Sequence, residues 1–240
     1  MNREQLAENL ARVRARMAAA AERAGRDPQA VRLVAVSKTH PAEAIQMAYD
    51  LGVRDFGESR VEEALPKMTA VHAWLAQQPG AQPITWHLIG HVQSRKVAAA
   101  FGPFDLIHSV DRVKLARKLA QLGEARAQAQ AILLEINLSG EASKFGLRPE
   151  EVGPLVDEIA AWPVLMVQGL MTIAPIVEDP AQARPIFQRL RVVAAEMAQR
   201  HPQLDWSQLS MGMTDDFEVA IEEGATLVRI GRAIFGEREA

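Results

Sequence analysis

The most constraining feature of the sequence is a repeat in which short apolar runs of strand length alternate with segments of helical character. Alternating strand and helix patterns imply parallel strands joined by right-handed crossovers. Eight such runs in 240 residues match a closed (β/α)8 barrel in both number and chain length. We therefore expect an α/β fold of the TIM-barrel class. The runs are Val31–Ser37, Val53–Gly57, Ile84–Ile89, Asp105–Val110, Ala131–Leu138, Val164–Leu170, Gln208–Met211 and Thr226–Ile230.

An open, doubly wound sheet is the alternative fold. Such a sheet, when it binds a nucleotide, often carries a glycine-rich phosphate turn directly after its first strand. The corresponding position here reads SKTH (Ser37–His40) and contains no glycine. The barrel is therefore the favoured fold.

An extra helix is expected before the first strand, over residues 2–24. Gly25 follows as a stop signal. No break in composition marks a second domain, so we expect residues 1–240 to form a single domain. The apolar residues of the helix recur at spacings of three and four, as on one helical face: Leu6, Leu10, Val13 and Met17.

Composition narrows the classes of partner. The net charge is -3 and the pI about 6.1, so the overall charge gives no sign of a nucleic-acid partner. No window approaches the roughly 18 apolar residues that a membrane span needs, and the first twenty residues do not resemble a signal peptide. Cysteine is absent, which excludes disulfides, thiolate metal sites and cysteine nucleophiles. We expect a cytoplasmic protein with neither a nucleic-acid nor a membrane partner.

Lys38 ends the first predicted strand, in VAVSKT (Val34–Thr39). In a barrel of this class the carboxyl ends of the strands form the functional rim. A lysine there points its amine toward the barrel mouth, above an apolar interior. Partial desolvation lowers the pKa of such an amine, as Schiff-base formation with an aldehyde requires. The alternative is an ordinary solvated lysine at a strand end.

Two turns near the C-terminus suit a phosphate group. LSMGMT (Leu209–Thr214) offers free backbone N–H groups and the hydroxyls of Ser210 and Thr214. TLVRIG ends at Gly231, where the backbone can approach a ligand closely. The loops after strands seven and eight are the recurrent phosphate site of this fold. Either turn alone could be an ordinary connection, and the acidic pair Asp215–Asp216 would repel a phosphate unless it points away.

Arg229 lies inside the otherwise apolar eighth strand. It either faces outward beneath a helix or sits in the barrel interior, where a guanidinium needs a partner. Closure of the barrel sets strand eight beside strand one, so one small ligand could contact Lys38, Arg229 and Gly231 together. An aldehyde at one end and a phosphate at the other describe pyridoxal 5'-phosphate. Arginine at the ring nitrogen would keep that nitrogen unprotonated and weaken the electron sink of the cofactor.

Three other groups of residues are weaker candidates. His87 and His91 have the i, i+4 spacing of a zinc helix, but they lack its glutamate and lie at a strand end, so no metal site is expected. The basic pair Arg95–Lys96 is more typical of a solvated helix start. Lys144, which follows Ser143 after the fifth strand, is a second rim lysine that could attract an anion, although exposure is the simpler expectation.

The motifs along the chain resemble those of the pyridoxal phosphate homeostasis protein family, nearly from end to end. The resemblance implies a fold-type III barrel like the N-terminal domain of alanine racemase, without that enzyme's second domain. It implies an internal aldimine on Lys38 and an arginine, Arg229, at the pyridine nitrogen. The motifs are Leu33–Thr39, Phe56–Glu58, Trp86–His91 with Gln93 and Ser94, Asn137–Lys144, Gly169–Pro175, Leu209–Thr214 with Asp216, and Val228–Gly236. The phosphate contacts that it implies are Ser210, Gly212, Met213, Thr214 and Gly231.

The same resemblance implies a function without robust catalysis. Members of this family are thought to buffer pyridoxal phosphate or deliver it to apo-enzymes that require it, and we expect a monomer or weak dimer. An amino-acid racemase is the alternative, but it needs an opposing acid–base group, commonly a tyrosine, and the single tyrosine is Tyr49. A Schiff-base aldolase that binds a sugar phosphate is a further alternative. Three positions depart from the family pattern, namely Ser59 and Arg95 in place of asparagine and Thr214 in place of serine, and the first puts a cofactor contact at Ser59 in doubt.

Overall fold

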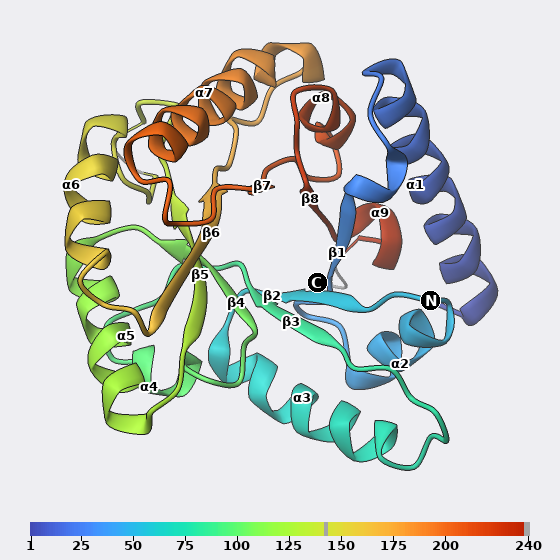
Figure 1. Cartoon of the computed structure of the whole chain (residues 1–240). Helices are drawn as coiled ribbons and strands as arrows, with labels where there is room; N and C mark the ends of the chain where they lie inside the picture. The colour runs from blue at the N-terminus through green and yellow to red at the C-terminus, as the bar shows by residue number, and fades with distance from the viewer. Residues whose placement is uncertain (142–143, 238–240) are drawn as a thin grey trace.

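The computed structural model describes residues 1–141 and 144–237, and these residues form a closed barrel of eight parallel strands (Figure 1). Each strand pairs with its neighbours in chain order, and β1 pairs with β8 to complete the ring. The predicted (β/α)8 fold is therefore confirmed, and the open sheet is excluded. The strands are β1 (Arg32–Val36), β2 (Asp55–Glu58), β3 (Thr85–Leu88), β4 (Leu106–Val110), β5 (Gln130–Glu135), β6 (Leu165–Met171), β7 (Gln208–Ser210) and β8 (Leu227–Ile230).

Helices surround the barrel and cover the outer face of the sheet (Figure 1). Long helices follow β2, β4 and β6, whereas the helices after β7 and β8 are short. The α-helices are α1 (Arg3–Arg23), α2 (Ala42–Asp50), α3 (Val61–Leu75), α4 (Val97–Ala100), α5 (Val113–Arg126), α6 (Pro149–Ile159), α7 (Arg184–Arg200), α8 (Phe217–Glu222) and α9 (Arg232–Phe235); the 3-10 turns are η1 (Pro28–Ala30) and η2 (Pro180–Ala183). No helix of the described residues is long and apolar enough to cross a membrane.

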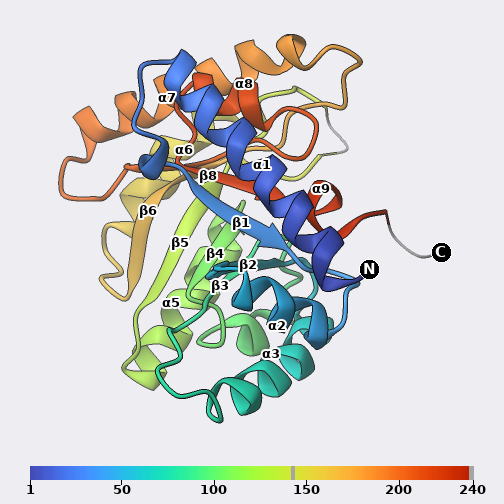
Figure 2. The same ribbon diagram turned by 90° about the vertical axis from the view of Figure 1, so that its right-hand side faces the viewer.

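The extra N-terminal helix is confirmed as α1, which lies along the outside of the barrel against α8 and α9 (Figure 2). Asn2 caps it by accepting a hydrogen bond from the backbone of Gln5 at 2.9 Å. The Asn9 side chain donates to the carbonyl of Ile234 at 3.0 Å, and Arg16 pairs with Glu218 at 2.8 Å. The first helix is thus fastened to the last two. Its predicted apolar face is buried: Leu6, Leu10, Val13 and Met17.

Side chains alternate between the two faces of the barrel wall. Outward-facing residues join a large core shared with the helices, whereas six residues form a small inner cluster: Val34, Leu106, Ala131, Leu133, Met171 and Leu227. Val34 pairs in register with Arg229, so the two share the inner face. The period of two that carries Val34 and Val36 inward also directs Lys38 toward the barrel mouth.

Candidate functional site

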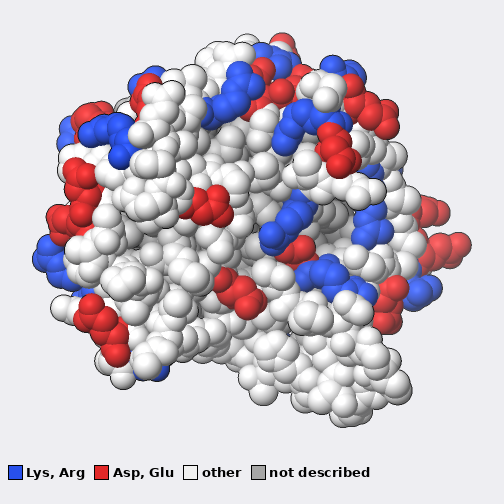
Figure 3. Space-filling view, viewed as in Figure 1, with Lys and Arg blue, Asp and Glu red and all other residues white. Residues whose placement is uncertain are grey.

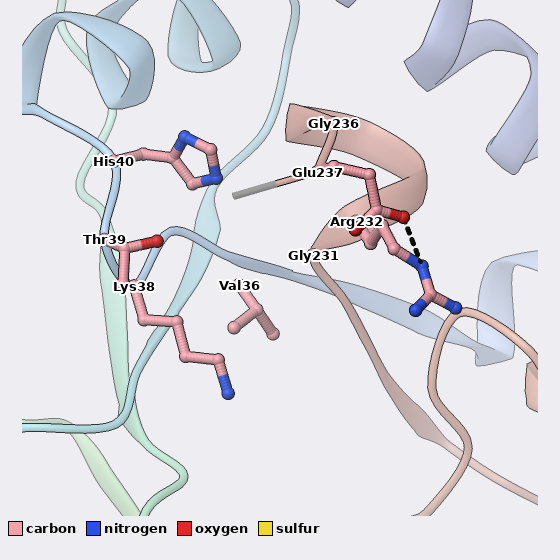
Figure 4. Close-up of a pocket in the computed structure, with 8 residues that line it drawn as sticks. All are labelled: Val36, Lys38, Thr39, His40, Gly231, Arg232, Gly236 and Glu237. Carbon is pink, nitrogen blue, oxygen red and sulfur yellow. Dashed lines mark ion pairs between the residues drawn. The ribbon is translucent and has the colours of Figure 1, made fainter. Parts of the chain in front are cut away.

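A cavity of about 400 Å³ opens at the mouth of the barrel between the ends of β1 and β8 (Figure 4). Figure 4 shows the Lys38 side chain extended on one side, with Arg232 and Glu237 on the other. On the same face, lysine and arginine side chains surround a hollow, with acidic side chains beside them (Figure 3). Barrel closure therefore brings Lys38 and Gly231 together, as the sequence predicted. The cavity is lined by Val36, Lys38, Thr39, His40, Gly231, Arg232, Gly236 and Glu237.

The backbone on both sides of Lys38 is held by charged side chains, of which Glu58 is fully buried. Ser37 donates its hydroxyl to Glu58 at 2.8 Å, and its carbonyl accepts a hydrogen bond from Lys67 at 3.0 Å. On the other side, the Thr39 amide donates to Glu63. Thr39 has a φ of 67°, a left-handed conformation that persists in a non-glycine residue only where its surroundings enforce it.

Lys67 connects these anchors. Its amine lies 2.6 Å from the carboxylate of Glu58 and 3.0 Å from that of Glu63, one helical turn away on α3. Burial raises the pKa of Glu58, although Lys67 and Ser37 oppose that effect. The i, i+4 spacing of Glu63 and Lys67 was visible in the sequence, but nothing in it indicated that the pair holds the Lys38 segment.

Arg229 points into the barrel, which excludes the outward-facing alternative. Its side chain is 4% exposed and donates to the Ser210 hydroxyl at 2.6 Å and to the Thr172 carbonyl at 2.9 Å. Burial lowers its pKa to about 10, while Asp216 and Glu135 act in the opposite direction. The guanidinium therefore stays protonated at neutral pH. A fixed positive charge lies inside the barrel on the strand next to Lys38.

The turn after β7 is shaped by Gly212 and Asp216. Gly212 has a φ of 89°, and a Cβ there would lie 2.6 Å from the Cβ of Ala220 on α8. Asp216 accepts a hydrogen bond from the Met213 amide at 2.6 Å, so its buried carboxylate points into the turn. Burial raises the pKa of Asp216. Thr214 accepts a long hydrogen bond of 3.5 Å from the backbone of Ala233, which places the turn against α9.

Ser210 lies deeper than a phosphate turn would place it. It is fully buried, and its hydroxyl oxygen lies within hydrogen-bond distance of Arg229 and of His108. Its side chain lies inside the barrel beside Arg229 and is not part of the cavity wall. A phosphate contact at Ser210 stays a prediction.

The acidic pair after the turn does not face the cavity as a unit. Asp215 pairs with Arg232, and the carboxylate of Asp216 accepts a hydrogen bond from the Met213 amide within the turn. Arg232 also lies 3.4 Å from Glu237 across the cavity rim. The repulsion expected between this pair and a phosphate is thus reduced by Arg232.

The histidines singled out in the sequence lie in separate environments. His87 is on the inner face of the barrel, bonded to His108 and Asp55. His91 lies beyond β3, 3.0 Å from Asp111, and stacks on Phe145 with ring centroids 3.7 Å apart. Within the described residues there is no group of three or more His, Cys, Asp or Glu side chains that could hold a metal ion.

The remaining weak candidates are engaged in local contacts. Lys96 pairs with Glu62, and Arg95 donates to Gln93 at 3.1 Å. Lys144 pairs with Glu141 at 2.7 Å and is partly buried, and Ser143 lies outside the described residues. The backbone of Ser59 packs so closely on Gly90 that a Cβ at Gly90 would lie 2.2 Å from the Ser59 carbonyl.

Sequence reasoning missed Glu135, the last residue of β5. It is buried, and its Oε2 has no hydrogen-bond partner. Burial raises its pKa to about 7, with a smaller contribution from Asp111, whereas Arg229 and Arg112 oppose the rise. Glu135 lies in an apolar run that is typical of a buried strand. A carboxylate in such a run was the only sign in the sequence that this position is unusual.

Known proteins match the chain over almost its whole length. The family model for the alanine racemase N-terminal domain matches residues 3–239. The pyridoxal phosphate homeostasis protein of Pseudomonas aeruginosa is 44% identical over 98% of this chain and 96% of its own. The protein of the same name from Aquifex aeolicus is 42% identical over 97% and 98%. Among solved structures, PipY of Synechococcus elongatus, described with PLP bound, is 36% identical with a TM-score of 0.83, covering 96% of this chain and all of its own.

The agreement of sequence, coverage and fold settles the relationship. The matched region includes every strand of the barrel and the segments that line the cavity. The chain belongs to the alanine racemase N-terminal domain family and, within it, to the pyridoxal phosphate homeostasis proteins.

Proposed function

We propose that this chain binds pyridoxal 5'-phosphate covalently through Lys38 and serves intracellular homeostasis of the cofactor by buffering or delivering it. The observation that carries the proposal is the placement of Lys38 and Gly231 on one cavity, with the cationic Arg229 inside the barrel on the strand next to Lys38. The names of the curated relatives and the PLP described in the PipY structure support it.

The residues present fit this group. A Cβ at Gly231 would lie 3.1 Å from the Val36 carbonyl, so glycine keeps the space between β1 and β8 open where a phosphate would approach. Lys38 would hold the aldehyde carbon, and Arg229 would face the ring nitrogen. The proposed phosphate contacts are Gly212, Met213, Thr214 and Gly231, together with Ser210, which is the least available of the five because its hydroxyl already bonds to Arg229 and His108.

Bound pyridoxal phosphate supplies an electrophilic aldehyde and an electron-withdrawing ring. Arg229 donates hydrogen bonds and cannot accept a proton, so it would leave the ring nitrogen unprotonated and the ring a weak electron sink. The anchored backbone around Lys38 fixes the position of the amine. These residues favour a tether over a catalyst, and we propose that the protein has no robust enzymatic activity.

The racemase alternative has less support. The hydroxyl of Tyr49 donates to the Gln82 carbonyl at 3.0 Å, and its ring is buried under Arg54. Tyr49 therefore lies away from the cavity and cannot oppose Lys38 across a substrate. We further propose a single domain over residues 1–240, a cytoplasmic location, a monomer or weak dimer, and PLP-requiring apo-enzymes as recipients.

Visible absorbance, borohydride trapping and peptide mapping test the proposal. Protein incubated with pyridoxal phosphate should gain a visible band and, after reduction, carry the label on Lys38. Lys38→Ala should lose the label, whereas Lys144→Ala, which alters the other rim lysine, should keep it. A label on another residue, or a colourless protein, would contradict the site and favour the aldolase alternative.

A second assay addresses catalysis. The purified holoprotein is incubated with single L-amino acids, and the D-forms are measured by chiral chromatography. Turnover that Lys38→Ala abolishes would favour the racemase.

A further inference from the structure

A continuous chain of hydrogen bonds runs through the barrel interior to Arg229. It begins at Asp55, whose carboxylate lies 3.0 Å from Nε2 of His87. The next contacts are 2.9 Å from Nδ1 of His87 to Nε2 of His108, and 2.9 Å from Nδ1 of His108 to the Ser210 hydroxyl. Arg229 then donates to the same hydroxyl at 2.6 Å. The residues come from β2, β3, β4, β7 and β8, so the chain connects most of the ring.

With both histidines neutral, the chemistry of the two ends fixes the direction of every hydrogen bond. Asp55 is an acceptor, because the hydrogen bond with His87 and the nearby Arg32 lower its pKa despite the opposing effect of burial. A neutral His87 therefore carries its proton on Nε2 and accepts at Nδ1. His108 must then carry its proton on Nε2 and accept at Nδ1.

At the other end, the guanidinium of Arg229 can only donate. The Ser210 hydroxyl accepts that hydrogen bond and donates its own hydrogen to Nδ1 of His108. Each link is satisfied when the donors all point from Arg229 toward Asp55. Burial lowers the pKa of His108 well below its usual value, and the positive charge of Arg229 adds to the effect, in agreement with a neutral ring.

The reverse direction is less favourable. It requires a second proton on His87, so that both histidines donate toward Ser210. Ser210 would then receive hydrogen bonds from both Arg229 and His108, and its own hydrogen would lose the acceptor that His108 provides.

We propose that His108, oriented by His87 and Asp55, is a positioning residue that fixes the Ser210 hydroxyl and, through it, the Arg229 guanidinium inside the barrel, on the strand next to Lys38. The proposal deepens the function proposed above, because it assigns to the histidine pair the task of setting the group that would face the cofactor ring. None of the three residues that orient Ser210 lines the cavity described above, so they act through Ser210 and not by contact. Buried polar networks of this kind fix one arrangement when every member is satisfied.

The proton positions can be measured without the cofactor. Long-range ¹H–¹⁵N spectra of protein with ¹⁵N-labelled histidine distinguish the two neutral tautomers and the charged ring. At pH 7.5 we expect His87 and His108 both to be neutral with the proton on Nε2. A proton on Nδ1 of His108, or a charged His108, would overturn the proposal whatever the protein binds.

Substitution of His108 tests the effect on the cofactor. His108→Phe removes the acceptor for Ser210, and we expect pyridoxal phosphate to bind about tenfold more weakly, the change that corresponds to one hydrogen bond. The visible band and the midpoint of its pH titration should also shift. His108→Gln can still donate toward His87 and accept from Ser210, so it should restore much of the wild-type spectrum, and it also provides the comparison if the phenylalanine variant does not fold.

His201→Phe is the matched control, since His201 is also buried but lies at the end of α7. Thermal denaturation of the apo-proteins measures the structural cost of each change. If His108→Phe lowers stability as His201→Phe does and leaves the band, its pH midpoint and the affinity unchanged, the positioning role is wrong. Failure of the wild-type protein to bind pyridoxal phosphate would contradict the proposed function instead, and the tautomer measurement separates the two outcomes.

Discussion

Replacement of Lys67 by methionine isolates the charge that anchors the Lys38 segment. Lys67 is 10% exposed and Glu58 is fully buried, with 2.6 Å between the amine and the carboxylate. Methionine keeps most of the stem and removes the ammonium group. Oε2 of Glu58 already has no hydrogen-bond partner, so the variant leaves the whole carboxylate dependent on Ser37.

Two estimates give the loss in the free energy of unfolding that Lys67→Met should cause. Removing one partner of a buried ion pair typically destabilises a protein by about 3–5 kcal/mol. Glu58 can avoid this by taking up a proton, and at pH 7.5 protonating a carboxyl group of ordinary pKa costs roughly 4 kcal/mol. We therefore expect Lys67→Met to lower the free energy of unfolding by about 3 kcal/mol at pH 7.5, or about 6–12 °C in Tm for a chain of this size.

The loss should depend on pH. Burial raises the pKa of Glu58 in the folded protein, and loss of Lys67, which lowers it, raises it further. A group with a raised pKa in the folded state binds more protons folded than unfolded, so its contribution to stability falls as pH rises through that range. The difference between variant and wild type should thus grow with pH, by at most about 1.4 kcal/mol per pH unit.

Urea denaturation of the apo-proteins at pH 5.5 and 7.5 measures both effects. The double variant Glu58→Gln/Lys67→Met removes the unpaired charge and should recover most of the loss at pH 7.5. A penalty under about 1 kcal/mol at pH 7.5, or an equal penalty at both pH values, would refute the view that Lys67 compensates a buried carboxylate.

Three further changes test other parts of the structure. Gly231→Ala, whose Cβ would lie 3.1 Å from the Val36 carbonyl, should weaken pyridoxal phosphate binding about tenfold in a fluorescence titration, because it narrows the cavity. Glu135→Gln should raise the free energy of unfolding by up to about 3 kcal/mol above pH 7 and have little effect near pH 4.5. The reason is that burial raises the pKa of Glu135 to about 7, so that its ionisation destabilises the fold. Urea denaturation across this pH range measures the effect, and a loss of stability at pH 8 would contradict it. Asp215→Asn should change Tm by no more than about 2 °C, since the Asp215–Arg232 pair is exposed.

The fold was predictable because each strand is a distinct apolar run and parallel strands have few alternative arrangements. The ends of the runs were less certain. The fifth run was expected to continue to Leu138, but β5 ends at Glu135, because Ile136 turns to bridge Leu147. An apolar side chain indicates that a residue is buried, but not that its backbone pairs with a neighbouring strand. The sequence therefore could not show where the hydrogen bonds between β5 and its neighbours end.

The candidate site was predictable where a position in the barrel determines a direction. Lys38 follows from its place at the end of the first strand, and barrel closure brings the strands of Lys38 and Arg229 together. The sequence alone left open whether Arg229 faces inward, and the structure decides this. The interior chain from Asp55 to Ser210 was not predictable, because it depends on the register between strands that lie far apart in the sequence. The spacing of His87 to His91 suggests a pair, whereas the actual partner of His87 is His108, on the neighbouring strand.

The pairing of β1 with β8 has a consequence for the order of events during synthesis. Lys38 leaves the ribosome about 190 residues before Arg229 and Gly231, which lie on or directly after the strand that completes its cavity. A nascent chain therefore carries the Lys38 amine without its cavity until the eighth strand has been made, and Arg229 takes its place inside only when the ring is complete. Capture of an aldehyde cofactor at this site would mark the moment at which the barrel closes.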